Sequence, residues 1–351
     1  MTDNHIPSGA MCAARNYSSL NEAFELAAKI ASARGEQYRA LAYRRAIISP
    51  ETVGSDLSGK IAEYKATGHI HDLDVLLSLP ETRASLELSK ILGFGPSTIR
   101  TLIGKGITSR ESLIDNVKHQ KITLTRMQNL GLQYFDDLQR KIPRDDVSRI
   151  SEIVFTKIFE SANEIFDSPE TARQLLVETT GSYRRHARES NDIDILVAGP
   201  DGAHSRRQRG DLGHVLLHKV HERMSDLPGF IDIITLGNQK YSFLFRYHWV
   251  VSIDIIYVPR SSYFAALIYF TGSRSFNIWM RDQCKKRGYS LNQYGLTKID
   301  APPAEEIAEE ASESPRDPER AIIRLDSEKH IFDILAIPYI PPANRDNPPS
   351  R

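Results

Sequence analysis

The first third of the chain carries the spacing of amphipathic helices. Between Tyr17 and Ser49 apolar residues recur every three or four positions, which places them on one face of a helix. The segment LSGKIAEYKA at 57–66 has the same pattern and ends at Thr67 and Gly68, a common helix stop. This part of the chain is therefore predicted to be a small helical unit.

A glycine turn interrupts the next helical pattern. In ASLELSKILGFGPSTIRTLIG at 84–104, Gly93 and Gly95 break the spacing, and Pro96 and Ser97 restart it at a new helix N-terminus. The sequence therefore predicts a helix, a tight turn and a second helix, with helical structure continuing to about residue 145.

The pattern changes after Pro143. VSRISEIVFTKIFESANEIF is still helical, but four later segments alternate or run in β-branched and aromatic residues, as strands do. These segments are LLVETTG, DIDILVAG, FIDIITLG and YSFLFRYHWVVSIDIIYV. We therefore predict an α+β chain with a helical front and a sheet-centred back.

Composition is that of a globular protein with more than one domain. The 351 residues are 40% hydrophobic and 26% charged, and the length is about twice that of a usual domain of ~150 residues. The longest apolar runs, such as FAALIYF at 264–270, are shorter than the roughly 18 residues that a membrane helix needs. Without the wider context, we read this run as a core strand that ends in aromatics. A soluble protein without a membrane partner is expected.

Cysteine content and the N-terminal sequence favour a reducing compartment. Cys12 and Cys284 alone cannot build a disulfide framework or a four-ligand zinc site. The start, MTDNHIPSG, lacks the charged and apolar regions of a signal peptide. An intracellular protein is expected.

The net charge of zero hides an uneven distribution. Residues 300–320 hold eight acids and two bases, a net of −6, so the remaining residues carry +6; residues 91–150 hold ten bases and six acids. A mildly basic front half fits a polyanionic partner, although a solvated helical surface would look the same. The acidic segment, with four prolines, is expected to be a surface loop or disordered.

Three aspartates in strand-like segments are candidate metal ligands. Asp192 and Asp194 are two apart, so their side chains would point to one face of a sheet. Asp254 lies in a similar segment, and a neighbouring strand could bring it to that face. Three carboxylates would suit Mg²⁺, and two such ions are the usual arrangement for phosphoryl or nucleotidyl transfer. Alternatively, these acids are the solvated face of half-buried strands.

A Gly-Ser pair shortly before the aspartates makes the metal interpretation more specific. Gly181 and Ser182 lie at a strand end, and Arg184 and Arg185 follow. Backbone N–H groups, a hydroxyl and guanidinium groups at this position could bind a triphosphate.

These motifs resemble those of the family X DNA polymerases, of the beta type with an N-terminal lyase domain. GSYRR with DIDILV is similar to the catalytic signature, and YFTGSRSFNIWMRDQCKKRGYSLNQYGL to the nucleotide-selecting segment. YRALAYRRA, VGSDLSGKIAEYKATGHI, GFGPSTIRTLIGKGI and DSEKHIFDILAIPYIPPANR also follow the family's order. The resemblance covers residues 16 to 345.

The resemblance implies a fold class and a domain division. The α+β chain would contain a helical lyase domain, helix-hairpin-helix fingers, a nucleotidyltransferase palm sheet and a mixed α/β thumb. The expected bounds are a flexible N-terminus at 1–15, lyase domain at 16–88, fingers at 89–150, palm at 151–261, thumb at 262–345 with the acidic insert at 300–320, and a tail at 346–351.

The resemblance also implies catalytic roles. Asp192, Asp194 and Asp254 would hold two Mg²⁺ ions, with Mn²⁺ as a substitute, and Asp254 would lie nearest the primer end and accept its proton. Binding of the β- and γ-phosphates would fall to Gly181, Ser182 and Arg185.

Further nucleotide and DNA contacts are implied in the segment from 269 to 296. Tyr269, Phe270 and Gly272 would crowd the sugar 2′ position. Asn277 would meet the incoming base and Arg274 would lie beside it, whereas Arg281 and Tyr294 would contact DNA. Alone, an Asn and an Arg four apart on a helix would be ordinary surface residues.

Lys60 matches the lysine that such polymerases use as a Schiff-base nucleophile. An amine attacks an aldehyde only when it is unprotonated, so neighbouring cations or burial should lower its pKa. Arg39, Arg44 and Lys65 are the expected sources of that field and of a 5′-phosphate pocket. By spacing alone, Lys60 would be a solvated helix lysine.

The glycine turns match helix-hairpin-helix modules, which present backbone N–H groups to a DNA phosphate. Gly93, Gly95 and Ser97 fit this pattern, and a monovalent cation is expected at their turn. The first module retains Gly54 but has Thr52 in place of its first glycine.

The expected function is DNA-directed synthesis over short gaps in base excision repair, with 5′-deoxyribose phosphate lyase activity. Gapped or nicked DNA and deoxynucleoside triphosphates would be the partners of a monomer in the nucleus or at a site of DNA replication. The alternatives are a template-independent or low-fidelity nucleotidyltransferase and an inactive DNA-binding scaffold.

Overall fold

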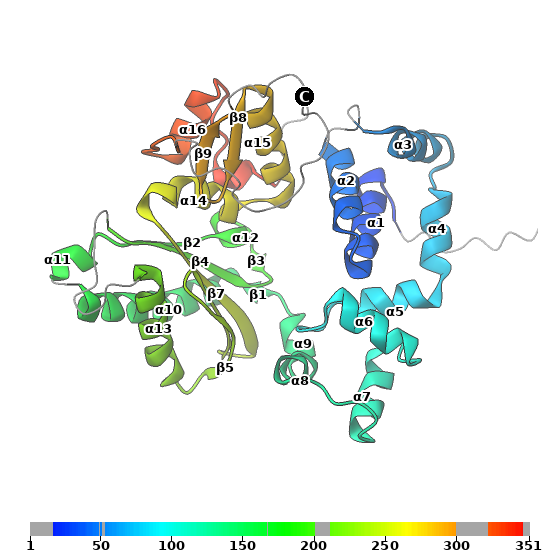
Figure 1. Ribbon diagram of the computed structural model, residues 1–351, viewed down its shortest axis with the longest axis horizontal. Helices are drawn as coiled ribbons and strands as arrows, with labels where there is room; N and C mark the ends of the chain where they lie inside the picture. Colours follow the sequence, from blue (N-terminus) through cyan, green and yellow to red (C-terminus); the bar gives the residue numbers. More distant parts are fainter. Residues whose placement is uncertain are drawn as a thin grey trace, which may run out of the picture. The chain divides into compact units, whose positions relative to one another are not determined.

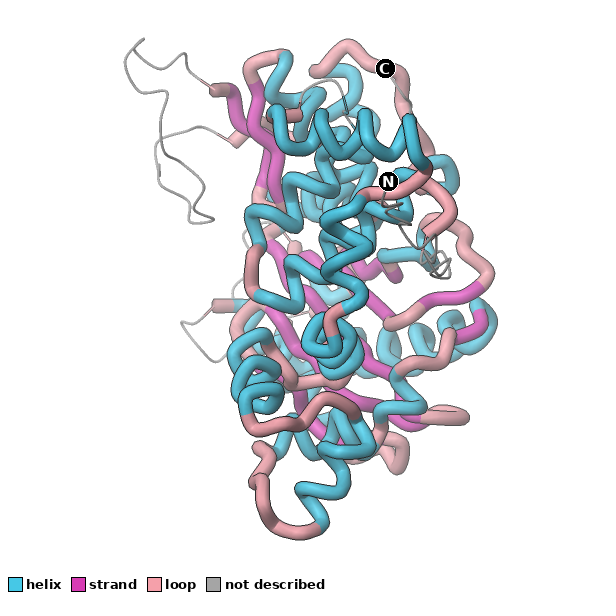
Figure 2. The backbone as a smooth tube through the Cα atoms, turned by 90° about the vertical axis from the view of Figure 1, so that its right-hand side faces the viewer, coloured by secondary structure: helices cyan, strands magenta, loops and turns pink. Residues whose placement is uncertain are grey.

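A computed structural model describes residues 17–48, 50, 53–166, 168–200, 211–299 and 322–346. The segments expected to be flexible or acidic, 1–15 and 300–320, lie outside the described residues, as do Thr52 and the tail beyond Asp346. The chain divides into two compact units, one from Met1 to Leu132 and a second from Gln133 to Arg351. Figure 2 shows the helices and strands of the chain; helices occur in both units, and every strand of the described residues belongs to the second.

The first unit is helical, as predicted. Its helices are α1 (Leu20–Arg34), α2 (Gln37–Ile48), α3 (Ser55–Thr67), α4 (His71–Ser78), α5 (Pro80–Leu88), α6 (Pro96–Gly104), α7 (Arg110–Lys118) and α8 (Arg126–Gln133). Helices α1 and α2 pack side by side (Figure 1), and Phe24, Ala28 and Tyr43 lie in the core that they share with α3 and α4. Ser19 caps the start of α1 through its side chain, and Gly35 ends it in the left-handed conformation.

The second unit is built around a five-stranded sheet. It contains α9 (Phe135–Leu138), β1 (Ile142–Pro143), α10 (Arg144–Ile165), α11 (Pro169–Ala172), β2 (Leu176–Thr179), α12 (Gly181–Arg184), β3 (Glu189–Ser190), β4 (Ile193–Ala198), α13 (Leu212–Ser225), β5 (Phe230–Leu236), β6 (Lys240–Arg246) and β7 (Val250–Val258). The strand order is β2-β4-β7-β6-β5. Within this sheet, only the pairing of β4 with β7 is parallel.

The remaining elements of this unit follow the sheet. They are η2 (Arg260–Ser262), α14 (Tyr263–Thr271), α15 (Arg274–Lys286), β8 (Tyr289–Asn292), β9 (Gly295–Lys298), α16 (Glu328–Ile334) and η3 (Pro342–Asn344). Strands β8 and β9 form a hairpin, and Phe276 of α15 lies close to Phe332 of α16.

The two faces of the sheet are covered by different elements. Helices α10 and α13 cover one face (Figure 1), where Ile195 and Ile253 belong to the main core. Helix α14 lies on the other face, and its Tyr263 and Ala266 pack with Leu196 of β4. Each face is apolar where helices cover it.

The run FAALIYF is helical, so our interpretation of it as a strand was wrong. It forms most of α14, where Ala265, Ala266 and Ile268 are all buried. A helix that is covered on several sides is apolar all round and loses the periodicity that would mark it in a sequence.

Candidate active site

Two aspartates face each other across the parallel strand pair. Residues on a strand alternate between faces, and Ile193 and Ile195 point into the core beneath α10 and α13. Asp194 therefore lies on the α14 face of β4. The same alternation in β7 places Asp254 on that face, directly in register with Asp194. Asp192 stands one residue before β4.

Burial and repulsion perturb these carboxylates. Burial raises the pKa of Asp194 to about 7, and the neighbouring charges of Asp192 and Asp254 add to the rise. Burial, followed by the Asp254 charge, also raises the pKa of Asp192. Such a group ionises readily only when a cation neutralises its surroundings.

Lys240 of β6 supplies part of that positive charge. Its Nζ lies 2.7 Å from Oδ2 of Asp254. Ser242, two residues further along β6, pairs with Asp254 in the sheet, and its buried hydroxyl has no partner among the described residues. Sequence analysis missed both residues, because only the antiparallel pairing of β6 with β7 brings them to the aspartates.

The donor set suits a hard divalent cation, because carboxylate oxygens are the ligands that Mg²⁺ prefers. Among the described residues, no group of three or more His, Cys, Asp or Glu is already arranged to hold a metal ion. Asp254 is instead paired with Lys240. Binding of a cation to all three aspartates would therefore require their side chains to converge and Lys240 to move away.

The Gly-Ser segment packs directly against Asp194. The backbone N–H of Thr180 donates to the Asp194 carbonyl oxygen over 2.7 Å. Gly181 has φ +57°, a backbone conformation that favours glycine, and a Cβ atom there would lie 2.8 Å from Oδ2 of Asp194. Ser182 donates through its hydroxyl to Ser190 Oγ at 2.8 Å.

Arg185 connects this segment to the end of α14. Its Nη1 donates to the carbonyl oxygen of Thr271 over 2.7 Å, and its Nε lies 2.7 Å from Oδ1 of Asp346. Arg184 binds both carboxylate oxygens of the buried Glu328. The two arginine side chains are similarly buried, with 17% and 16% of their surface exposed, but they have different partners.

The turn after α14 carries the next group of predicted site residues. Gly272 has φ +65°, and the Gly272–Ser273 peptide bond is cis. Asn277 donates through Nδ2 to the carbonyl oxygen of Tyr269 over 2.7 Å. The guanidinium of Arg281 lies 5.4 Å from the centre of the Tyr269 ring.

Three predicted contacts lie at the edges of this region. The ring centre of Phe270 is 5.0 Å from that of Tyr269. Arg274 is exposed at the first residue of α15. Tyr294 lies between β8 and β9 with 44% of its surface exposed.

The C-terminal segment holds Asp346 beside Arg185. Arg345 is fully buried, and its Nη1 lies 2.9 Å from Oε1 of Glu328. Its carbonyl oxygen accepts a hydrogen bond from Ser273 Oγ at 2.7 Å. No sequence pattern joined residues 185 and 346, so sequence analysis missed this contact.

In the first unit, the glycine turn before α6 has the expected local form. Gly93 is left-handed with φ +84°, Gly95 is the N-cap of α6, and Pro96 and Ser97 open the helix. Gly54 stands likewise at the N-cap of α3, without a side-chain cap. These helix starts can present backbone N–H groups to an anion.

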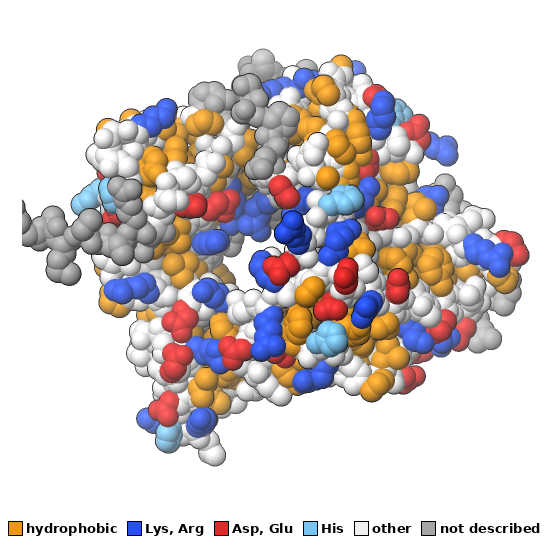
Figure 3. Space-filling model, turned by 180° about the vertical axis from the view of Figure 1, so that it is seen from behind, with side chains coloured by type: hydrophobic (Ala, Val, Ile, Leu, Met, Phe, Trp, Pro, Cys, Tyr) orange, Lys and Arg blue, Asp and Glu red, His pale blue; other side chains and the backbone are white. Residues whose placement is uncertain are grey.

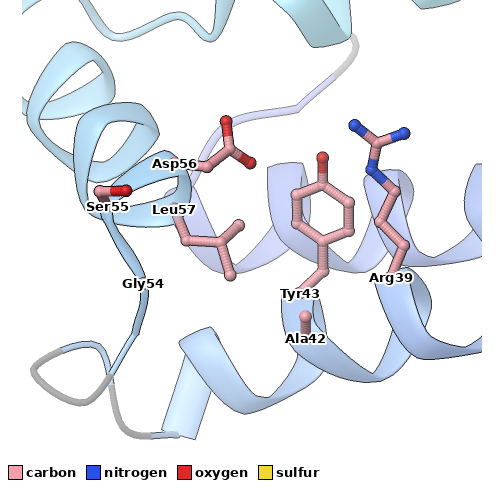
Figure 4. A pocket seen from close by; sticks show the side chains of 7 residues that line it. All are labelled: Arg39, Ala42, Tyr43, Gly54, Ser55, Asp56 and Leu57. Carbon is pink, nitrogen blue, oxygen red and sulfur yellow. The ribbon is translucent and has the colours of Figure 1, made fainter.

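A cavity of about 340 Å³ lies between α2 and the start of α3. Figure 4 shows Arg39 and Tyr43 on one wall and Asp56 and Leu57 on the other.

Lys60 is paired with acids, so the expectation that neighbouring cations lower its pKa was wrong. Its Nζ lies 2.6 Å from Oδ1 of Asp56 and 3.1 Å from Oδ2 of Asp72. Burial lowers the pKa of Lys60, but the two carboxylates outweigh burial and raise it. Arg44 donates to Ser32 Oγ. Sequence analysis missed Asp72, which is brought in by the turn between α3 and α4.

Charge on the visible surface is mixed. On the face drawn in Figure 3, Lys and Arg side chains are interspersed with Asp and Glu, in line with a net charge of zero. No helix of the described residues combines the length and the apolar character that a membrane span requires.

Comparison with known proteins places this architecture among DNA polymerases. Three family models match in chain order: the fingers domain of DNA polymerase lambda at 86–139, the DNA polymerase beta palm at 141–248 and the DNA polymerase beta thumb at 266–346. A palm of this kind implies nucleotidyl transfer that depends on divalent metal. The palm match ends before Asp254, whose position comes from the strand register.

Curated relatives match almost the whole chain. DNA polymerase lambda of Rattus norvegicus is 28% identical over 363 residues, which are 95% of this chain and 57% of that protein. DNA polymerase lambda of Arabidopsis thaliana is 26% identical, over 93% of this chain and 62% of that protein. DNA-directed DNA/RNA polymerase mu of Homo sapiens is 24% identical, over 93% and 68%.

The chain thus spans less than two thirds of the length of the two polymerase lambda relatives. The α+β fold predicted from sequence is confirmed, with its helical front, palm sheet and thumb. This fold, together with the fingers, palm and thumb matches in chain order, shows that the chain belongs to the family X DNA polymerases.

Proposed function

We propose that the protein is a DNA-directed DNA polymerase that fills short gaps during base excision repair. The observation that carries this proposal is the in-register pair of Asp194 and Asp254 on β4 and β7, with Asp192 just before β4. The raised pKa of Asp194 supports it, because a site of crowded carboxylates needs cations to ionise.

The three aspartates are proposed to hold two Mg²⁺ ions, with Mn²⁺ as a substitute. Bound there, the ions would supply positive charge to the triphosphate and the primer oxygen. Asp254 would accept the proton of the primer 3′-hydroxyl. The new bond joins that oxygen to the α-phosphorus, and pyrophosphate leaves.

The triphosphate would bind at the start of α12. There the N–H groups near Gly181, the Ser182 hydroxyl and the Arg185 guanidinium can neutralise the charge that grows on the leaving group. The fixed turn around Gly272, which is tied to Arg185 through Thr271, would crowd a ribose 2′-hydroxyl. Tyr269 and Phe270 would line this sugar site.

The remaining polar groups of the thumb would position nucleotide and template. Asn277 would meet the incoming base and the exposed Arg274 would lie beside it. Arg281 and Tyr294 would contact DNA. Arg281 lies on α15 and Tyr294 between β8 and β9, and both side chains are exposed.

The helical modules are proposed to hold gapped or nicked DNA through its phosphates. Gly93, Gly95 and Ser97 would present N–H groups at the start of α6, with a monovalent cation at the turn, and Gly54 would do the same at α3. The expected domain bounds, with the fingers at 89–150, remain proposals, as do a monomeric state and a nuclear or replication-site location.

A second activity, removal of 5′-deoxyribose phosphate, is proposed for the first unit. Its support is Lys60, a largely buried primary amine beside the cavity that Arg39 and Tyr43 line. Arg39 would bind the 5′-phosphate, and Lys60 would form an imine with the sugar aldehyde.

Primer extension on a one-nucleotide gap tests the polymerase proposal. Asp254→Asn should lower kcat by about 10²–10⁴-fold, because it removes the proton acceptor. Asp226→Asn, which changes an exposed acid of the same unit, is the matched control. Unchanged incorporation in Asp254→Asn would contradict the assignment, and incorporation that ignores the template base would favour the template-independent alternative.

A further inference from the structure

Lys60 is held between carboxylates from two helices. Asp56 lies one turn earlier on α3, and Asp72 lies in the first turn of α4. The Lys60 side chain is only 10% exposed, whereas those of Asp56 and Asp72 are 68% and 67% exposed. The ammonium is thus buried, and its two partners face solvent.

Besides Asp56, one charged residue lines the cavity next to Lys60, namely Arg39. Of the residues that line the cavity, Arg39 of α2 and Asp56 carry charge, and Tyr43 adds a phenol. The hydrogen bond to Glu36 contributes most to the raised pKa of Arg39, and the charge of Asp56 adds to it. Asp56 is therefore shared between the lysine and the cavity.

We propose that Asp56 and Asp72 are positioning residues that keep Lys60 in its ammonium form and so delay its attack on a sugar aldehyde. This inference rests on the proposed lyase activity and specifies how it is controlled. We call the pair the Asp56–Asp72 clamp.

The chemistry requires the clamp to release its lysine. In imine formation, the ammonium first gives a proton to water, and the free electron pair of Nζ then bonds to C1′ of the aldehyde. The carbonyl oxygen takes up protons and leaves as water, and a C=N bond remains. While both carboxylates hold the ammonium, that electron pair is not available.

The balance of burial and charge sets the direction of the effect. Burial alone would push the pKa of Lys60 below its ordinary value, and only the two carboxylates raise it. Replacing either carboxylate by an amide should therefore lower the pKa of Lys60 and enlarge its unprotonated fraction at neutral pH.

Borohydride trapping on incised abasic DNA, measured from pH 6 to 9 with saturating DNA, tests the clamp. Asp56→Asn and Asp72→Asn should each trap about twofold to fivefold faster at pH 7, the size expected for partly exposed ion pairs. Their limiting rates at high pH should equal that of the unaltered protein. Glu81→Gln, which neutralises an exposed acid on α5, should leave the profile unchanged.

An NMR titration of the lysine side chains measures the effect of the clamp on the pKa of Lys60 without any reaction. The Lys60 signal, assigned by its loss in Lys60→Ala, should titrate at lower pH in both asparagine variants. Equal titration and equal trapping profiles in all proteins would overturn the clamp. Full trapping by Lys60→Ala would instead overturn the lyase proposal, whereas the titration would still report on Asp56 and Asp72.

Discussion

At the scale of single residues, the active-site chemistry is decided by charges that lie far apart in the sequence. Asp192 and Asp194 could be recognised from their spacing, and Asp254 from its strand. Lys240 and Asp346 could not, because their contacts with Asp254 and Arg185 arise from sheet pairing and from the buried anchor Arg345. Charge pairing over such separations leaves no periodic signal in the sequence.

The raised pKa of Asp194 predicts a pH-dependent stability. The folded chain binds a proton at Asp194 up to about pH 7, whereas an unfolded aspartate releases it near 3.8. Stability should therefore fall as pH rises through this range. Asp194→Asn should be more stable than the unaltered protein by about 4 kcal/mol at pH 8 in EDTA, and nearly equal to it near pH 4.

Urea unfolding at both pH values, with EDTA present, measures this difference. Asp226→Asn serves as the control for loss of one exposed charge. A stability difference that does not change with pH would show that folding does not raise the pKa of Asp194.

The contact between Asp346 and Arg185 should weaken nucleotide binding, because the carboxylate competes with phosphate for the guanidinium. Its carboxylate lies 2.7 Å from Nε of Arg185, the group proposed to bind phosphate. Asp346→Asn should lower KM for the incoming nucleotide by about twofold to fivefold, the size of a partly exposed ion pair. Steady-state incorporation kinetics measure the change, with Asp333→Asn of α16 as control. A raised KM would mean instead that Asp346 orients Arg185 for binding.

At the scale of elements, alternation and glycine placement were sufficient to predict most of the fold. The strands at 192–199 and 251–258 follow from their β-branched pattern, and the turn at 93–95 from its glycines. Helix α14 could not be predicted, because cover on several sides removes the polar positions that reveal a period. Burial, and not local propensity, decided that segment.

The turn before α6 should lose stability when a methyl group is added at Gly93. Gly93 has φ +84°, and an added Cβ would lie 3.2 Å from the backbone of Gln128. Gly106 has a similar φ of +77° but open space around it, so it controls for backbone strain alone. Gly93→Ala should lose more stability than Gly106→Ala, by about 1 kcal/mol.

Thermal unfolding and binding to gapped DNA at fixed salt measure both effects. We expect weaker DNA binding in Gly93→Ala and none of that loss in Gly106→Ala. Equal behaviour of the two variants would mean that the turn tolerates side chains and does not shape a phosphate site.

At the scale of the whole molecule, the proposed activities belong to different compact units. Lys60 lies in the unit ending at Leu132, and the aspartates lie in the unit that begins at Gln133. The family resemblance indicated both activities, but the sequence did not reveal that acids surround Lys60. The turn that brings Asp72 of α4 to Lys60 had no recognisable signature.

This division predicts that the two activities can be removed separately. Lys60→Ala should abolish borohydride trapping and leave gap filling within about twofold, and Asp254→Asn should do the reverse, since residues that share no contacts act independently. Parallel assays on one gapped substrate with a 5′-deoxyribose phosphate measure both. Loss of both activities in either variant would show that the units are coupled.

The parallel pairing of β4 with β7 also affects how the protein is made. The 51 residues between Ala198 and Val250 must be synthesised and folded before Asp254 can meet Asp194. A nascent or prematurely terminated chain that ends before β7 would already carry the nucleotide-binding turn but not its complete set of carboxylates. The long-range pairing of β4 with β7 thus prevents activity in an incomplete chain, because the proposed DNA synthesis can start only when the sheet is complete.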